Sequence, residues 1–70
     1  MINFTCGDTV ESRGLCVYIK NDVVVFRRVR RHTFGFVYDI VDYRENEMGR
    51  QHETLYTRSD AIRRIGWILG

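Results

Sequence analysis

The sequence predicts an α+β domain in which a curled antiparallel sheet of four to five strands is followed by one C-terminal α-helix. Two observations predict this class. β-branched and aromatic residues dominate the chain up to residue 56, whereas a helical spacing of apolar residues occurs only after it. The 70 residues are expected to form a single domain, 1–70, because so short a chain builds only one small core.

The expected strands are bounded by residues that favour turns. They cover residues 2–6, 15–20, 23–31, 34–43 and 51–56. Asn21-Asp22 is predicted to form a two-residue hairpin turn, because both residue types tolerate positive φ. His32-Thr33 is predicted to form the next turn, and the polar segment 44–50 to form the loop before the last strand.

The helix is predicted over residues 58–69. Thr57 and Asp60 fit the capping pattern of a helix N-terminus. One apolar stripe, expected to face the sheet, contains Ala61, Ile62, Ile65, Ile68 and Leu69. Arg63 and Trp67 lie on the opposite side, which predicts that Trp67 anchors an interface beside Arg63. The alternative is that the last turn frays and Trp67 folds back onto the sheet edge.

Strict alternation along the strands places apolar residues on both faces of the sheet. One face is expected to carry Cys16, Tyr18, Val23, Val25, Val29, Phe34, Phe36, Tyr38 and Ile40, and the other Leu15, Val17, Ile19, Val24, Phe26, Val37 and Val41. A single helix covers only one face of a sheet. The sheet is therefore expected to close partly with the strand at 2–6, and the chain to form a homodimer.

Two segments resemble known proteins. One segment, followed by a β-meander, resembles the opening strand of small SH3-like barrels; it is Phe4-Thr5-Cys6-Gly7-Asp8-Thr9-Val10. The other resembles the strand-to-helix junction of many small phage-encoded and prophage-encoded accessory proteins; it is Leu55-Tyr56-Thr57-Arg58-Ser59-Asp60-Ala61-Ile62. These resemblances imply an SH3-like partial barrel and a non-enzymatic protein that binds host or defence proteins. They imply no site residue.

Basic residues are concentrated in the second strand. Ten of the 11 Lys and Arg residues are Arg, and four of these lie within positions 27–31. The predicted pairing sets Arg27 opposite Tyr38, and it sets Phe26 opposite Asp39 with Arg28 diagonal to that carboxylate. Arg27 and Arg28 are therefore expected to serve contacts within the sheet. Arg30 and Arg31 have no predicted acidic partner and are expected to reach outward.

The charge pattern predicts a binding protein whose partner is a protein. The expected contact residues are Arg30, Arg31, His32, Arg63 and Trp67. A chain that is basic at one hairpin and acidic near 42–47 suits a matching protein surface. The alternative is a nucleic-acid-binding protein that uses the 26–38 hairpin, with contacts from Arg27, Arg28, Arg30, Arg31, Phe36 and Tyr38. The resemblance to phage-encoded accessory proteins implies that this protein partner is a host or defence complex, which the chain is expected to inhibit or modulate.

Other functions find no support in the sequence. Cys6, Cys16, His32 and His52 are ligand types for zinc, but no two of them lie within four residues, so no metal is expected. Serines, histidines and carboxylates show no nucleophile–base spacing, and there is no glycine-rich phosphate loop, so neither enzymatic activity nor a cofactor is expected. Without a signal-like or membrane-spanning segment, a cytoplasmic protein with two reduced cysteines and no membrane contact is expected.

Overall fold

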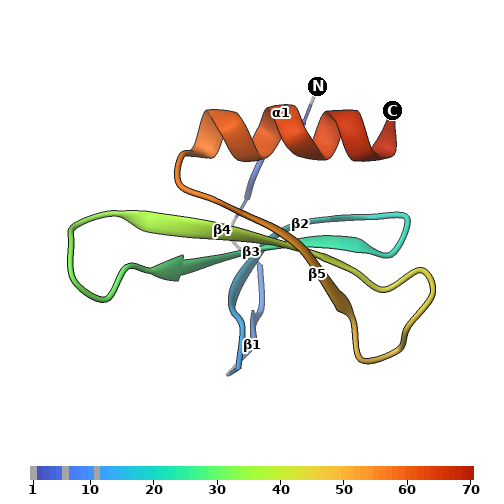
Figure 1. Cartoon of the computed structure of the whole chain (residues 1–70), viewed down its shortest axis with the longest axis horizontal. Helices are drawn as coiled ribbons and strands as arrows, with labels where there is room; N and C mark the ends of the chain where they lie inside the picture. The colour runs from blue at the N-terminus through green and yellow to red at the C-terminus, as the bar shows by residue number, and fades with distance from the viewer. Residues whose placement is uncertain (1, 6, 11) are drawn as a thin grey trace.

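The computed structural model describes residues 2–5, 7–10 and 12–70. Five antiparallel strands form one sheet in the order β1-β2-β3-β4-β5, and one helix lies across a face of that sheet (Figure 1). The elements are β1 (Thr9–Val10), β2 (Gly14–Lys20), β3 (Val23–Val29), β4 (Phe36–Asp42), β5 (Arg50–Leu55) and α1 (Arg58–Leu69). The predicted α+β class is confirmed. The sheet remains open, because β1 and β5 are its edges in the described part of the chain.

Helix α1 covers the predicted residues and begins at the predicted cap. The Thr57 hydroxyl oxygen accepts a hydrogen bond from the Asp60 N–H at 3.2 Å. Ala61 and Ile65 are fully buried, and they pack the helix onto β4 and β5. Below them lies the larger core, which includes Val23, Val25 and Ile40 from β3 and β4.

The N-terminal segment corrects the predicted strand at 2–6. Residues 2–5 are not a strand, and Cys6 lies outside the described residues. The segment crosses the helix side of the sheet, where the Phe4 ring lies 5.9 Å from the Tyr18 ring and 5.8 Å from the Tyr38 ring. A backbone hydrogen bond from the Thr5 N–H to the Val17 carbonyl oxygen, at 2.9 Å, ties the segment to β2. The segment therefore fills the core beside α1 and adds no strand to the sheet.

A β-bulge in β2 corrects the predicted faces. The pairing of β2 with β3 shifts between Cys16, opposite Phe26, and Tyr18, opposite Val25. The alternation breaks at Val17, so Leu15 and Val17 lie on the helix side. Cys16 lies on the other side, where it packs with residues of a second, smaller core. Strict alternation had exchanged these three residues between the two faces.

The sheet curls enough to bury much of the face opposite α1. Four residues of that face, Val24, Phe26, Val37 and Val41, are buried within the chain. Arg13 in the β1–β2 turn donates from Nη2 to the Met48 carbonyl oxygen in the β4–β5 loop at 3.3 Å. The backbone at Gly14, where β2 begins, lies so close to β3 that a Cβ there would lie 2.6 Å from the Arg27 carbonyl oxygen. The apolar face that motivated the expected homodimer is thus largely covered by the chain itself.

The two long hairpins end differently. Asn21 and Asp22 have φ values of 52° and 63°, which is the left-handed conformation that the predicted turn requires. At the other hairpin the strands stop at Val29 and start again at Phe36, so residues 30–35 form a loop. The predicted turn at 32–33 is too short, because the connection has six residues and ends at Gly35, whose φ of 111° closes the longer loop.

Asp39 joins three strands on the face opposite α1. Its Oδ2 accepts a hydrogen bond from Arg28 Nε at 2.7 Å, which confirms the predicted diagonal pair. Its Oδ1 accepts from Thr54 Oγ1 at 2.6 Å and from Gln51 Nε2 at 3.1 Å. The carboxylate is buried and fully hydrogen-bonded, so it stabilises the alignment of β3, β4 and β5.

No helix in the described part of the chain is long and apolar enough to cross a membrane.

Candidate binding surfaces

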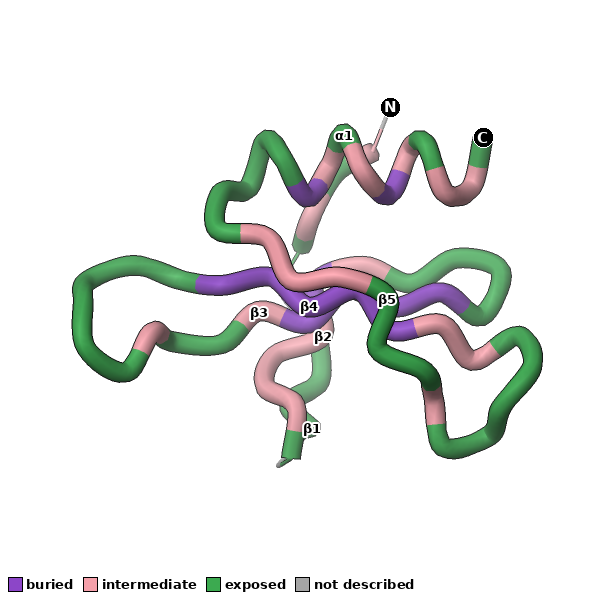
Figure 2. The backbone as a smooth tube through the Cα atoms, viewed as in Figure 1, coloured by how far each residue is buried: buried purple, intermediate pink, exposed green. Residues whose placement is uncertain are grey.

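The far end of the β3–β4 hairpin extends beyond the start of α1 and is exposed (Figures 1 and 2). We call this region the hairpin-end surface and define it by Arg27, Arg30, Arg31, Phe34, Phe36 and Tyr56. Tyr56 comes from the connection between β5 and α1, so two segments distant in sequence build the surface. A hollow in the hairpin loop is lined by residues 29–36.

Two arginines of this surface are held against aromatic rings. The Arg27 guanidinium lies 4.2 Å from the centroid of Phe36, and that of Arg30 lies 5.1 Å from the centroid of Tyr56. Arg30 also donates from Nη2 to the Tyr56 carbonyl oxygen at 2.9 Å. A guanidinium fixed in this way keeps other N–H groups free for a carboxylate or a phosphate. The stacked arginines are therefore pre-oriented for an anion.

The hairpin-end surface also exposes apolar area. Phe34 is 104% exposed and has no support from the rest of the chain, while Val29 and Tyr56 are 69% and 62% exposed. Arg31 and His32 lie beside Phe34 in the same exposed loop. Exposed aromatic rings among arginines are typical of surfaces that bind another molecule.

The structure separates some of the residues that the sequence grouped together. Arg28 lies on the opposite face of the sheet with Asp39, and Tyr38 is buried against Phe4. Neither residue belongs to the hairpin-end surface, so the proposed set of nucleic-acid contacts loses both. Tyr56 is not among the contact residues that the sequence predicted, because nothing in the neighbouring sequence indicates that its ring lies against Arg30.

Trp67 belongs to a second surface, on the side of α1 that lies over β5. Its side chain points outward and is 71% exposed, as the helical spacing predicted, and does not fold back onto the sheet. The Arg64 guanidinium lies 5.3 Å from the centroid of the indole ring, while Arg63, the residue predicted to lie beside Trp67, pairs with Asp60 at 3.8 Å. Arg64 also pairs with Glu53 of β5 at 2.9 Å. Helix geometry places Trp67 about two and a half turns from the start of α1, which is the end near the hairpin.

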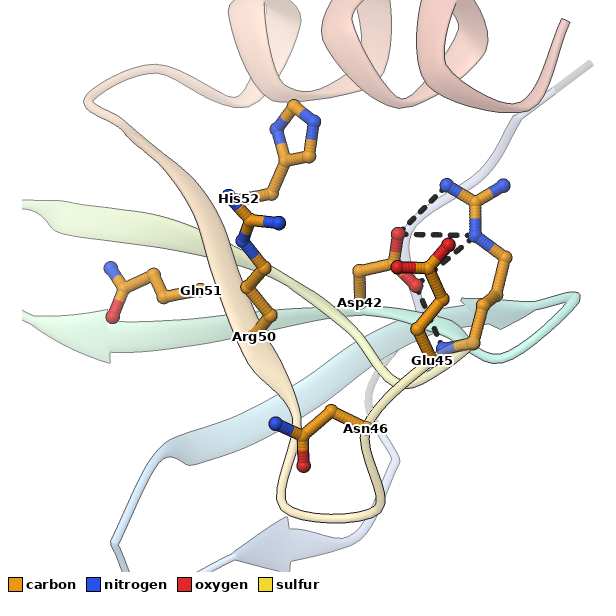
Figure 3. A pocket seen from close by; sticks show the side chains of 7 residues that line it. Asp42, Glu45, Asn46, Arg50, Gln51 and His52 are labelled. Carbon is orange, nitrogen blue, oxygen red and sulfur yellow. Dashed lines mark hydrogen bonds and ion pairs between the residues drawn. The ribbon is translucent and has the colours of Figure 1, made fainter.

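A polar hollow lies where β4 runs into the loop that leads to β5 (Figure 3). Arg44 forms a hydrogen-bonded ion pair with Asp42 there: Arg44 Nη2 lies 2.7 Å from Asp42 Oδ2, and Arg44 Nε lies 3.1 Å from Asp42 Oδ1. The hydrogen bonds from Arg44 lower the pKa of Asp42, and Asp42 in turn raises the pKa of Arg44. His52 points away from this pair, toward α1, in Figure 3. Within the described residues, the hollow contains no hydrogen-bonded nucleophile and base.

The histidines and the described cysteine are dispersed over the fold. Cys16 lies in the smaller core, His32 in the β3–β4 loop and His52 in β5. No three metal-ligand side chains come together among residues 2–5, 7–10 and 12–70. Cys6, the other cysteine, lies outside these ranges.

In comparisons with known proteins, no family model, no curated protein and no solved structure matches the chain.

Proposed function

We propose that this chain is a non-enzymatic binding protein and that its hairpin-end surface contacts an acidic surface of a protein partner. The observation that supports this most is the local charge. The residues that define the surface include three arginines, Arg27, Arg30 and Arg31, and neither Asp nor Glu. Such a one-signed patch attracts anionic groups and speeds the encounter with a partner that has them.

The apolar part of the surface favours a protein as the partner. Phe34 is large, rigid and fully exposed, and a pocket on a partner would bury it with a gain of a few kcal/mol, roughly that of burying any such side chain. Arg27 and Arg30 already lie against aromatic rings, so little side-chain freedom is lost when each binds a carboxylate. The combination of an apolar anchor and pre-oriented cations suits an acidic protein surface.

A second candidate is binding of single-stranded nucleic acid through the same surface. One observation favours it: Asp42, Glu45 and Glu47 lie toward the opposite end of the sheet, where they do not repel a phosphate chain at the hairpin (Figure 1). Phe34 and Tyr56 are exposed aromatic rings of the kind on which bases stack, and Arg31 extends into solvent, where it can contact phosphate. Without Tyr38 and Arg28, the stacking surface is smaller than the sequence predicted.

The more specific proposal, a phage-type stoichiometric inhibitor or modulator of a host or defence complex in the cytoplasm, comes from the resemblance of the two short segments. It concerns the identity of the partner and adds no residue to the surface. The geometry supports the coarser function, a binding module with a basic and aromatic contact surface, and this is what the experiment below tests.

Two labelled probes of equal charge distinguish the candidates: a peptide that alternates Glu with Leu, and a single-stranded oligothymidylate. We expect fluorescence anisotropy to show tighter binding of the peptide, because Leu gives Phe34 an apolar contact. Tighter binding of the oligothymidylate would assign the surface to nucleic acid. Failure of both probes to bind at low salt would contradict an anion-binding role for this surface.

A further inference from the structure

We infer that a second copy of this chain docks on the side of α1 that lies over β5. We call this region the α1–β5 flank and define it by Glu53, Leu55, Asp60, Arg63, Arg64 and Trp67. It shares no residue with the hairpin-end surface. The inference is therefore independent of the proposed function and goes beyond it.

The flank carries both parts of a self-complementary contact. Trp67 projects from it with 71% of its surface exposed. A hollow of about 420 Å³ lies on one side of the indole, which itself forms one wall, and its other lining residues are Leu55, Asp60, Arg63 and Arg64. In a two-fold symmetric contact every residue of the patch meets the same patch on the other copy. A projecting ring next to a hollow meets this requirement, because each Trp67 enters the hollow of the other copy.

The charges of the flank also match a second copy. Glu53 and Asp60 provide two negative charges, and Arg63 and Arg64 provide two positive ones. The pairs that these residues make within one chain, Arg64–Glu53 at 2.9 Å and Arg63–Asp60 at 3.8 Å, leave the side chains partly exposed. A balanced set of charges can face its own copy with opposite signs in contact. The hairpin-end surface is positive throughout and would repel its copy.

The sequence also predicted a homodimer, but for a different reason. That reason was an uncovered apolar sheet face, and the curl of the sheet largely covers it. The large apolar side chain that stays exposed on α1 is the indole of Trp67. An exposed Trp loses the stabilisation that its burial would give, and a second copy restores that stabilisation.

Sedimentation velocity and intrinsic fluorescence test the inference together, because Trp67 is the sole tryptophan of the chain. From low to high micromolar protein, we expect the mass to rise toward a dimer and the Trp67 emission to shift to the blue. Trp67→Ser should weaken the association roughly thirtyfold. The melting temperature of the dilute protein should stay the same, because the side chain is exposed in the single chain.

Phe34→Ser is the matched control. It removes another exposed aromatic ring, at the hairpin-end surface, and should leave the dimer intact. A monomer mass with red-shifted, quencher-accessible emission at the highest concentration would overturn the inference. Dissociation by Phe34→Ser but not by Trp67→Ser would also overturn it, because the contact would then lie at the hairpin end.

Discussion

Asp39→Ala is expected to lower the free energy of unfolding by about 2 kcal/mol, a large fraction of the stability of so small a domain. Asp39 is 7% exposed, and its carboxylate accepts hydrogen bonds from Arg28, Gln51 and Thr54. Its removal ends three contacts that connect β4 to its two neighbouring strands. Arg28 and Gln51 reach solvent and can regain water, which keeps the cost below that of a fully buried charge. Urea denaturation followed by circular dichroism measures the change.

Asp42→Ala is the control for this variant, since it removes an ion pair of the same length. The Asp42–Arg44 pair also measures 2.7 Å, but it connects the last residue of β4 to the loop that follows and joins no two strands. Exposed pairs contribute little to stability, so we expect the denaturation midpoint to change little. Equal effects of the two aspartate variants would show that Asp39 does not hold the strands in alignment.

Arg31→Glu combined with Phe34→Ser is expected to weaken binding of the Glu-Leu peptide by at least about tenfold. The variant reverses one exposed charge and removes one exposed ring at the hairpin-end surface. Both side chains extend into solvent, so the melting temperature should not change. Anisotropy titration of the variant against the unmodified chain measures the loss.

Arg50→Glu is the matched charge control for this double variant. It reverses one exposed charge at the start of β5 and should leave most of the peptide affinity intact. Arg30→Glu is unsuitable as the test, because Arg30 is bonded to the Tyr56 carbonyl oxygen and stacked on its ring. The sequence had grouped Arg30 with Arg31 as outward-reaching, whereas the structure gives Arg30 a role in holding the loop. If Arg50→Glu weakened binding as much as the double variant, net charge and not the surface would control it.

Features fixed by neighbouring residues were predictable from the sequence. The helix follows from the capping pair and from a stripe of apolar residues at helical spacing, both of which are local. The pairing of β3 with β4 places Arg27 opposite Tyr38 and Phe26 opposite Asp39, as predicted, because no bulge interrupts it. The Arg28–Asp39 bond followed from that pairing.

Features that depend on distant contacts were not predictable. The bulge at Cys16 and Tyr18 leaves no mark in a run of alternating residues, so the faces of β2 were assigned wrongly. The packing of Phe4 against Tyr18 and Tyr38 beside α1 depends on the shape of the finished core. The position of Tyr56 under Arg30 depends on how far the hairpin extends past the start of the helix. These are tertiary effects, which override local pattern.

Mapping of backbone amide shifts by NMR tests the central claim most directly. Isotope-labelled protein is titrated with the Glu-Leu peptide, and each amide is followed. We expect the largest changes at Arg27, Arg31, Phe34 and Tyr56, which surround the exposed end of the hairpin. Changes centred on the polar hollow at 42–52, or the absence of changes at saturating peptide, would contradict the assignment of the hairpin-end surface as the binding surface.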